Sequence, residues 1–387
     1  MTTMAIDNKD KKVLNVPHLR FPEFSGEWKK HSLGEIGETI IGLTYKPSDV
    51  VDNNGIIVFR SSNIKNGMID YSDLVRVNKH IKDKIITKEN DILVCARNGS
   101  QRLIGKNAII KQEDANNTFG AFMMVYRAND NPFILPLLST KKYFSQVGEN
   151  LGARINQITT SDFNGFEFYF PENHAERTKI AELFRLLDER IATQNKIIED
   201  LKKLKSAISE RLFKSVKGST VLLSDLCDIV KGKQINGENL SDSGNYYVMN
   251  GGTEPSGYYD NYNVEASTIS ISEGGNSCGY VQFNTSPFWS GGHCYSIQNI
   301  ADKVDNMYLY HYLKSNEDAI MKLRIGSGLP NIQKKDLAMF KIIVPKIEWQ
   351  IKISTFLSSL ERKAEIEERI QNVMQKQKLY LLQQMFI

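Results

Sequence analysis

The sequence lacks any apolar run close to the roughly 18 residues that a membrane-spanning helix requires. Its opening stretch, MTTMAIDNKDKK, is polar and has no apolar core of a secretion signal. We therefore expect a cytoplasmic protein with no membrane partner, in which residues 1–16 form a flexible N-terminal segment.

Cysteine is also scarce. Cys95, Cys227, Cys278 and Cys294 lie far apart, and no two of them form a Cys-x-x-Cys pair. This spacing indicates neither a zinc site nor a disulfide framework. We expect four buried free thiols and no bound metal.

The sequence offers little to support an enzyme. The stretch GSQRLIGKN is close to a phosphate-binding loop, but Gly99 and Gly105 stand one residue too far apart, and Asn107 replaces the Ser or Thr that would hold magnesium. No Pro-Pro dipeptide occurs, so the Asn/Asp-Pro-Pro-aromatic motif of an amino-methyltransferase is missing. His293 and Cys294 are neighbours, whose side chains in a strand would point to opposite faces. We predict no catalytic residue in this chain.

Two long segments, 172–217 and 348–387, contain neither glycine nor proline. In both, apolar residues recur at spacings of three and four, which is the period of one helix face. Two long helices with matching apolar stripes pack most simply on each other as a coiled coil. If a pseudo-twofold axis relates the two units, the two helices must run antiparallel. The predicted seam consists of Ile180, Phe184, Leu187, Ile191, Ile198, Leu201, Ile208, Leu212, Ile353, Leu357, Leu360, Ile366, Ile370, Met374 and Leu381.

These helices close the two halves of an internal repeat. At an offset of 174 residues, four positions match between the halves: Gly152, Ile158, Asp162 and Pro171 with Gly326, Ile332, Asp336 and Pro345. At an offset of 190, Leu33 and Gly42 match Leu223 and Gly232, and at 173 Phe213 matches Phe386. The repeated unit is therefore a domain followed by a helix, and the second domain is shorter in its middle.

Each domain has a mixed pattern. Short β-type runs are GIIVFR, DILVCA, AFMMVYR and FEFYF in the first domain, and YYVMN, STISIS, YVQF and FKIIVP in the second. One short helix is expected in each, near PLLSTKKYFSQV and MYLYHYLKSNEDAI. We predict an α+β fold: two similar mixed α/β domains in tandem, each followed by a long helix, with pseudo-twofold symmetry. The predicted domains are 17–171 and 218–345, and the predicted helices are 172–217 and 346–387.

Polar, glycine-rich loops follow strands at matching places in both domains. They carry the donors that grip phosphates and read base edges, and the net charge of +4 permits a nucleic-acid partner without demanding one. Any single loop of this kind is ordinary, but the recurrence in two units favours binding. The predicted DNA-binding residues are Arg60, Ser61, Ser62, Asn63, Lys65, Arg97, Asn98, Ser100, Gln101, Arg102, Lys106, Arg154, Asn156, Gln157, Lys231, Lys233, Asn250, Tyr258, Tyr259, Asn276, Ser277, His293, Arg324, Ser327, Asn331 and Lys334.

In this arrangement the chain resembles the specificity subunits of type I restriction-modification systems. The resemblance rests on LRFPEFSGEWKKHSLGEI at residues 19–36, on FRSSNIKNG, on the stretches DILV and NGS, on GLPNIQKKDL, and on the paired KIAELFRLLDERI and KISTFLSSLERKA. Domain, helix, domain and helix follow in the same order over nearly the full length.

The resemblance implies that each domain is a target-recognition domain that reads one half of a bipartite, asymmetric target in double-stranded DNA. The helices would set the half-site spacing and dock two methyltransferase subunits, with two translocase and nuclease subunits in the full complex. The chain would be non-catalytic and hold no cofactor, because S-adenosylmethionine, ATP and magnesium would belong to partner chains, of which the methyltransferases modify adenine N6. Such a complex would work at the bacterial nucleoid.

The resemblance also points to a docking surface. An exposed helix face with Glu182, Arg185, Glu189 and Arg190 is the place where we expect the methyltransferase. Two other interpretations stay open from the sequence. One is a stand-alone two-headed DNA- or carbohydrate-binding protein with a coiled-coil spacer. The other is a nuclease that uses Glu113 and Asp114, or Asp260 and Glu265.

Overall fold

The computed structural model describes residues 15–151, 156–326, 328 and 330–387. Contacts within the chain divide it into two compact units, Met1–Thr193 with Gln371–Ile387, and Gln194–Ile370. Each unit holds one mixed domain and a part of both long helices. The expected flexible segment 1–16 falls outside the described residues except for its last two positions.

The two longest elements are α5 (His174–Ser215) and α9 (Ile347–Met385), with 42 and 39 residues. The side chain of Asn173 accepts a hydrogen bond of 2.9 Å from the Ala175 amide, which caps an N–H group at the start of α5. Gly218 follows the end of this helix. No helix in the described part of the chain is both long and apolar enough to cross a membrane.

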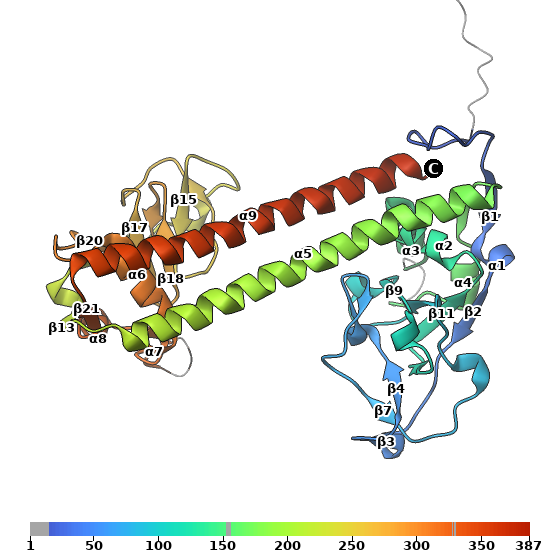
Figure 1. Cartoon of the computed structure of the whole chain (residues 1–387), viewed down its shortest axis with the longest axis horizontal. Helices are drawn as coiled ribbons and strands as arrows, with labels where there is room; N and C mark the ends of the chain where they lie inside the picture. The colour runs from blue at the N-terminus through green and yellow to red at the C-terminus, as the bar shows by residue number, and fades with distance from the viewer. Residues whose placement is uncertain (1–14, 152–155, 327, 329) are drawn as a thin grey trace, which may run out of the picture. The chain divides into compact units, whose positions relative to one another are not determined.

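In the first unit, α5 and α9 lie side by side and run in opposite directions (Figure 1). Phe184 lies against Phe386, just past the end of α9, with 5.6 Å between ring centroids. One turn further along α5, Asp188 pairs with Lys378, about two turns back along α9. Residue numbers fall on one helix as they rise on the other, so the pairing is antiparallel, as predicted.

Within the second unit, α5 and α9 are also antiparallel, and polar contacts join them. Gln194 donates to a carboxylate oxygen of Glu367 at 2.7 Å and to its backbone oxygen at 3.1 Å. Further along, the Lys205 ammonium lies 2.6 Å from the Glu361 carboxylate. The seam predicted as apolar therefore has polar pairs at its middle positions.

The predicted seam is correct on α5, where all its members are buried or half-buried, but partly wrong on α9. Ile366 and Ile370 are 48% and 39% exposed. The half-buried positions in this part of α9 include Ala364, Glu367 and Gln371. The apolar residues Ile366 and Ile370 each lie one residue before a half-buried position, so the apolar pattern predicts the wrong residues for the seam.

The first domain is built from an antiparallel strand pair, two four-stranded sheets and a two-stranded hairpin. The pair is β1–β12, the sheets have the orders β2-β11-β8-β9 and β10-β4-β7-β3, and the hairpin is β5–β6. The strands are β1 (Lys29–Ser32), β2 (Glu38–Ile41), β3 (Val50–Val51), β4 (Ile56–Phe59), β5 (Ile64–Lys65), β6 (Met68–Ile69), β7 (Arg76–Val77), β8 (Ile92–Cys95), β9 (Asn107–Ile109), β10 (Thr118–Phe119), β11 (Met123–Arg127) and β12 (Glu167–Phe170). The helices are α1 (Leu33–Ile36), α2 (Asn131–Leu137), α3 (Lys141–Leu151) and α4 (Thr160–Asn164).

The second domain repeats this plan with fewer strands. Its pair is β13–β21, and its sheets have the orders β14-β20-β17-β18 and β16-β15-β19. The strands are β13 (Ser219–Leu222), β14 (Asp228–Lys231), β15 (Tyr246–Met249), β16 (Tyr258–Tyr259), β17 (Thr268–Ser272), β18 (Val281–Asn284), β19 (Trp289–Ser290), β20 (Cys294–Gln298) and β21 (Lys341–Val344). The helices are α6 (Asn306–Ser315), α7 (Glu317–Met321) and α8 (Lys334–Ala338). Each β-type run predicted from the sequence is present. The expectation of one short helix in each domain is wrong, because PLLSTKKYFSQV is divided between α2 and α3, MYLYHYLKSNEDAI is divided between α6 and α7, and further short helices occur.

Equivalent backbone hydrogen bonds confirm the repeat at Gly42 and Gly232. The Gly42 amide donates to Met123 O, and the Gly232 amide donates to Cys294 O. A Cβ on either glycine would come within 2.2 Å of a backbone oxygen, Gly120 O or Gly291 O respectively. Both glycines are therefore required by the same close approach of two backbone segments.

Each long helix ends in the core of a domain through a phenylalanine. Phe213 of α5 packs in the second unit against Tyr308 and Tyr312, with ring centroids 5.8 and 5.2 Å away. Phe386 packs in the first unit against Trp28 and Phe133, at 6.3 and 5.8 Å. The repeat at offset 173 thus marks two equivalent anchors.

Candidate nucleic-acid interface

In the first domain, three polar segments that are far apart in the sequence meet. They are the loop after β4, the loop after β8 and residues 156–157. The Asn98 side chain donates to the Ser61 hydroxyl at 2.9 Å, and the Asn98 amide donates to Asn156 O at 3.3 Å. Arg97 forms an isolated β-bridge with Gln157. The structure therefore brings together members of all three loops predicted to bind DNA in this domain.

The second domain assembles a matching cluster. The Asn250 side-chain oxygen accepts from the His293 amide at 3.1 Å, and Gly274 forms an isolated β-bridge with Asn331. Between them lies Glu273, which is only 8% exposed. The loops after β15 and β17 and the segment before α8 thus converge here as their counterparts do in the first domain.

The Glu273 carboxylate organises this second cluster. Its Oε1 accepts from the Lys231 ammonium at 2.6 Å and from the Tyr295 hydroxyl at 3.1 Å. Its Oε2 is buried without a hydrogen bond and lies 3.8 Å from His293 Nδ1. A buried carboxylate next to an exposed histidine and an exposed lysine is the most strongly polar feature of this loop cluster.

Matching hydrogen bonds establish which positions of the two clusters are equivalent. The Ala96 amide donates to Phe122 O, and the Glu273 amide donates to His293 O. The Ile158 amide donates to Ala96 O, as the Ile332 amide does to Glu273 O. The strand registers also pair Ile41 with Met124 and Lys231 with Tyr295. The parallel pairs of Phe59 with Phe119 and of Met249 with Ser290 align the residues that follow β4 and β15. The resulting equivalent pairs are Ile41 and Lys231, Arg60 and Asn250, Ala96 and Glu273, Arg97 and Gly274, Phe122 and His293, and Gln157 and Asn331.

Some residues predicted to bind DNA in the loop after β4 instead form contacts within the protein. Asn63 is fully buried, and its side chain accepts from the Arg60 amide and donates to Asp70 O and Asp73 O. This burial contradicts the expectation of a solvent-facing donor. Arg60 lies 2.8 Å from the Asp73 carboxylate and Lys65 lies 3.1 Å from that of Asp70, so both cations already have carboxylate partners.

Other predicted cations are available. Six of them reach solvent and form no ion pair with any residue of the described ranges: Arg97, Arg102, Lys106, Lys233, Arg324 and Lys334. Ser62, Ser100 and Gln101 are also exposed, whereas Asn156 and Gln157 are half-buried. Free cations of this kind suit contacts with phosphate groups.

The remaining predicted residues of the second domain divide between the cluster and its surroundings. Tyr258 and Tyr259 are half-buried in β16, where Tyr259 packs on Trp289 with 5.1 Å between ring centroids. Asn276 and Ser277 lie in the turn from β17 to β18. Arg154 and Ser327 lie outside the described residues.

Three members of these clusters are not among the residues predicted from the sequence. Phe122 and Ile41 are each 59% exposed, and Glu273 is the buried carboxylate described above. A lone aromatic, a lone aliphatic and a lone acid carry no pattern of their own. Alignment of the two halves at Gly42 and Gly232 would have identified Ile41 and Lys231 as equivalent, since each immediately precedes its glycine.

The four cysteines are free and buried, as predicted. Burial raises the pKa of the thiols of Cys95 and Cys294 to about 11 and that of Cys227 to about 12. Cys294 is buried while its neighbour His293 is exposed, so the two side chains point to opposite sides as expected. These thiols are therefore poor nucleophiles at neutral pH.

One hydrolase-like pattern does occur and fails on structural grounds. Residues 275–279, GNSCG, fit the Gly-x-Ser-x-Gly pattern, whose serine sits on a turn from strand to helix. Here the pattern lies in the turn between the antiparallel strands β17 and β18. Asp114, one of the acids considered for a nuclease, is buried and accepts from the Lys111 amide at 3.1 Å as a local cap.

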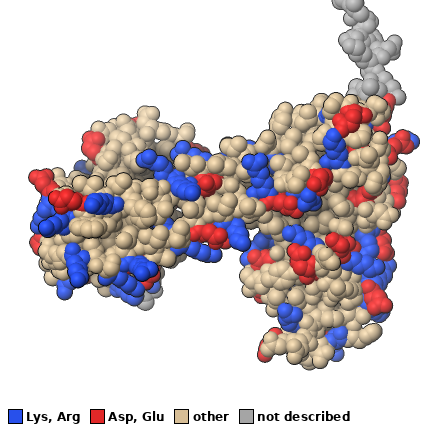
Figure 2. Space-filling model, in the orientation of Figure 1, with Lys and Arg blue, Asp and Glu red and all other residues tan. Residues whose placement is uncertain are grey.

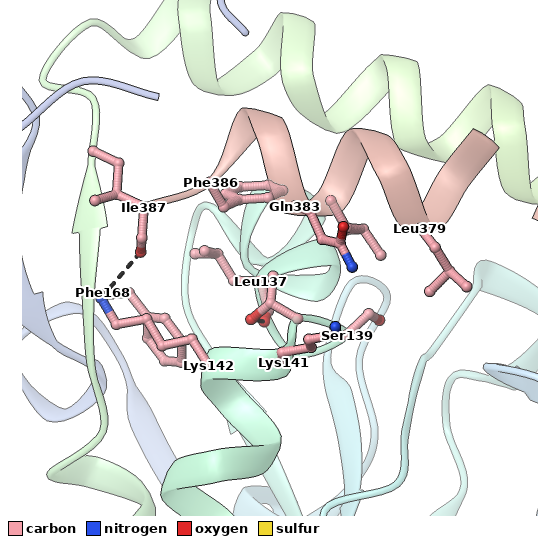
Figure 3. Close-up of a pocket in the computed structure, with 11 residues that line it drawn as sticks. Leu137, Ser139, Lys141, Lys142, Phe168, Leu379, Gln383, Phe386 and Ile387 are labelled. Carbon is pink, nitrogen blue, oxygen red and sulfur yellow. Dashed lines mark hydrogen bonds between the residues drawn. The ribbon is translucent and has the colours of Figure 1, made fainter. Parts of the chain in front are cut away.

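The charge distribution does not single out another site on the face seen in Figure 2. On the face seen in Figure 2, basic and acidic side chains are interspersed on each unit. No group of three or more His, Cys, Asp or Glu within the described residues could hold a metal ion. A cavity of about 220 Å³ lies between α3 and the end of α9 (Figure 3), with mainly apolar lining from Leu137, Phe168, Leu382 and Phe386. It lies beside the Phe386 anchor.

Comparison with known proteins agrees with this architecture. The family described as type I restriction modification DNA specificity domain matches the chain twice, at residues 25–203 and 217–376. A putative type I specificity subunit of Mycoplasma genitalium is 34% identical over 122 residues, which are 31% of this chain and 31% of the relative. A second one, from Mycoplasma pneumoniae, is 32% identical over 145 residues, 37% of this chain and 38% of the relative. This chain thus matches only about a third of the length of these two relatives.

Longer matches also exist. The putative type I restriction enzyme MjaX specificity subunit of Methanocaldococcus jannaschii is 25% identical over 404 residues, 92% of each chain. The crystal structure of a type I restriction-modification system S subunit from M. genitalium superposes with a TM-score of 0.67 at 19% identity, covering 96% of this chain and 99% of that one. This likeness shows the shared fold.

Two tandem mixed domains, each followed by a long helix, with equivalent polar loop clusters, define a protein with two equivalent heads. The chain belongs to the family of type I restriction-modification DNA specificity subunits.

Proposed function

We propose that each domain of this specificity subunit reads one half of a bipartite target in double-stranded DNA through its loop cluster. The observation that carries this proposal is the equivalence of the two clusters, which hold different side chains on matching backbone positions. Two domains that carry different side chains on matching backbone positions suit a DNA target whose two half-sites differ in sequence.

The chain is proposed to act on DNA only through partners. Methylation of adenine N6 with S-adenosylmethionine would belong to two methyltransferase subunits, and ATP- and magnesium-dependent translocation and cleavage to two further subunits. Support comes from the buried thiols of Cys95 and Cys294, whose raised pKa values make them poor nucleophiles, and from Asp114, whose carboxylate accepts a local backbone hydrogen bond.

Exposed apolar side chains on the helices are the proposed docking surfaces for the methyltransferases. In the first unit Leu186, Val373 and Tyr380 are 50%, 64% and 58% exposed. In the second unit Ile197 and Leu204 are 40% and 51% exposed and lie seven residues apart on one face of α5. Large apolar residues left in solvent on polar helices favour a protein partner.

The charged face expected from the sequence is less suited to be the centre of that interface. The Arg185 guanidinium lies 2.7 Å from the Glu182 carboxylate and 2.5 Å from that of Glu189, so these charges already satisfy one another. We therefore assign this face to the rim of the docking surface and the apolar residues to its centre.

Methylation mapping tests the proposed function directly. Cells that express this chain with its methyltransferase should carry N6-methyladenine at one bipartite motif. Replacement of residues 219–345 by the second domain of another family member should change one half of the motif and leave the other half intact. A motif that stays the same after this replacement, or methylation without any bipartite motif, would contradict the proposal.

A further inference from the structure

Arg97 is a cation of the first loop cluster whose side chain lies over an aromatic ring. Its guanidinium carbon lies 5.1 Å from the centre of the Phe122 ring, and it forms no ion pair with a described residue. Phe122 itself is 59% exposed. An arginine that rests on an aromatic ring keeps its donors free while its orientation is restricted.

The backbone around Arg97 is fixed from two directions. The Arg97 amide donates to Phe122 O at 3.0 Å, and the residue bridges to Gln157. The next residue, Asn98, is bound to the Ser61 hydroxyl at 2.9 Å and uses its side-chain oxygen to accept from the Ser100 amide at 2.9 Å. The side chain of Arg97 therefore projects from an ordered platform, which lowers the entropic cost of binding.

The chemistry of the side chain selects its ligand. A guanidinium presents parallel N–H donors, which match two neighbouring acceptors. In the major groove, guanine offers such acceptors at N7 and O6, whereas adenine, cytosine and thymine each offer at most one. Arg60 is less suited to this task because it is already paired with Asp73 at 2.8 Å.

The second domain has no such pair at the equivalent positions. Gly274 stands in place of Arg97, and His293 stands in place of Phe122. The carboxylate of Glu273 replaces the methyl group of Ala96. The arginine and its aromatic support are thus confined to the first domain, which makes them a difference between the two readers.

We propose that Arg97 reads a guanine in the half-site of the first domain through its N7 and O6 atoms, and that Phe122 is the positioning residue for Arg97. The proposal rests on the proposed function, namely that the loop clusters read DNA. Beyond that function, it specifies the base that is recognised, the residue that recognises it and the domain in which this residue lies.

The first experiment compares methylation motifs. The wild-type chain and its methyltransferase should methylate a motif with a guanine in one half. In Arg97→Ala and Arg97→Lys, that guanine should become degenerate while the other half stays unchanged, because a lysine cannot bond both acceptors in the same geometry. The matched control is His293→Ala, at the equivalent place of the second domain, which should leave the guanine intact.

The second experiment isolates the atom that is read. Duplexes with 7-deazaguanine at this position lack the N7 acceptor, and the wild-type complex should bind them about 10-fold more weakly. Arg97→Ala should lose affinity for the natural duplex and show no further loss on 7-deazaguanine. Phe122→Leu should weaken the discrimination in part, and Phe122→Tyr should restore it. Lys106→Ala, which removes a nearby half-buried cation, should weaken binding to both duplexes equally.

The outcomes separate the two proposals. If the wild-type complex yields no bipartite motif, the proposed function fails. If the motif is bipartite but Arg97→Ala keeps every guanine, or still discriminates against 7-deazaguanine, the assignment of Arg97 is overturned. If Phe122→Leu lowers thermal stability without any change in discrimination, the positioning role of Phe122 is overturned.

Discussion

Arg20 holds the carboxylate of Glu176 with two hydrogen bonds of 2.7 Å, from Nε to Oε1 and from Nη2 to Oε2. Glu176 is fully buried at the start of α5 and also accepts from Trp28 Nε1 at 3.3 Å. The pair therefore connects the stretch before β1 in the first domain to the start of α5. A bidentate arginine is the partner that can neutralise a buried carboxylate in this geometry.

Removal of Arg20 should strongly destabilise the first unit. In Arg20→Ala the buried Glu176 charge loses its partner, and we expect the free energy of unfolding to fall by about 3 kcal/mol. The double variant Arg20→Met with Glu176→Gln removes the charge as well and should recover at least half of this loss. Urea unfolding of the full chain measures both. A double variant that is no more stable than Arg20→Ala would show that the charge is not the cause.

Asn63 and Ser62 offer a matched pair that separates a structural role from a DNA contact. Asn63→Ala leaves the Arg60 backbone amide and Asp70 O without their partner and removes one of the two donors to Asp73 O, the other being Arg60 Nη2. We expect a loss of about 2 kcal/mol in the free energy of unfolding. Ser62→Ala changes an exposed hydroxyl and should leave stability within about 0.5 kcal/mol. Thermal melts of both variants decide this. Equal melting temperatures would contradict the structural role of Asn63.

These residues also show how far the sequence predicts this fold. The strands and helices follow from apolar periodicity and turn residues, which are local properties. The repeat follows from glycines such as Gly42 and Gly232, because a close backbone approach excludes every other residue. Whether a loop asparagine faces solvent or is buried depends on segments that are distant in sequence, so Asn63 was assigned to the wrong environment.

The errors on α9 have a related cause. A residue belongs to a coiled-coil seam because of its position on the helix surface that faces the partner helix. The sequence shows only whether that residue is polar or apolar. Where Glu367 occupies a seam position and is bound by Gln194, apolar spacing points instead to the exposed neighbours Ile366 and Ile370. Polar seam residues of this kind fix the register of two helices at some cost in stability. The same argument applies to the loop clusters, where the role of Phe122 depends on Arg97.

Substitution of the exposed apolar residues on α5 should impair assembly. Ile197→Glu together with Leu204→Glu places two charges in the proposed centre of a docking surface, and we expect co-purification with the methyltransferase to fall at least about 10-fold. Because both side chains are exposed, the melting temperature of the free chain should hardly change. Arg185→Ala, on the self-paired charged face, is the control and should reduce co-purification by less than about 3-fold. A larger loss of co-purification in Arg185→Ala than in the double variant would place the charged face at the centre of the docking surface.

The stability of the second unit should fall in mild acid because of His311. This side chain is 2% exposed in α6, with Nε2 2.9 Å from the Ser358 hydroxyl. Burial lowers the pKa of His311 from 6.5 to about 4, a decrease that Lys205 reinforces and that the carboxylates of Glu361 and Asp305 oppose.

The sign of the pH effect follows from the two pKa values. Between pH 6.5 and pH 4 the unfolded chain binds a proton at His311 that the folded chain does not, so stability decreases as the pH falls through this window. Between pH 6.5 and pH 5 this single site should lower the free energy of unfolding by about 1.5 kcal/mol. His311→Gln has no titrating group at this position, so the difference between wild type and variant in urea unfolding isolates the effect. Parallel curves for the two proteins over this pH range would mean that His311 is protonated as readily in the folded chain as in the unfolded one.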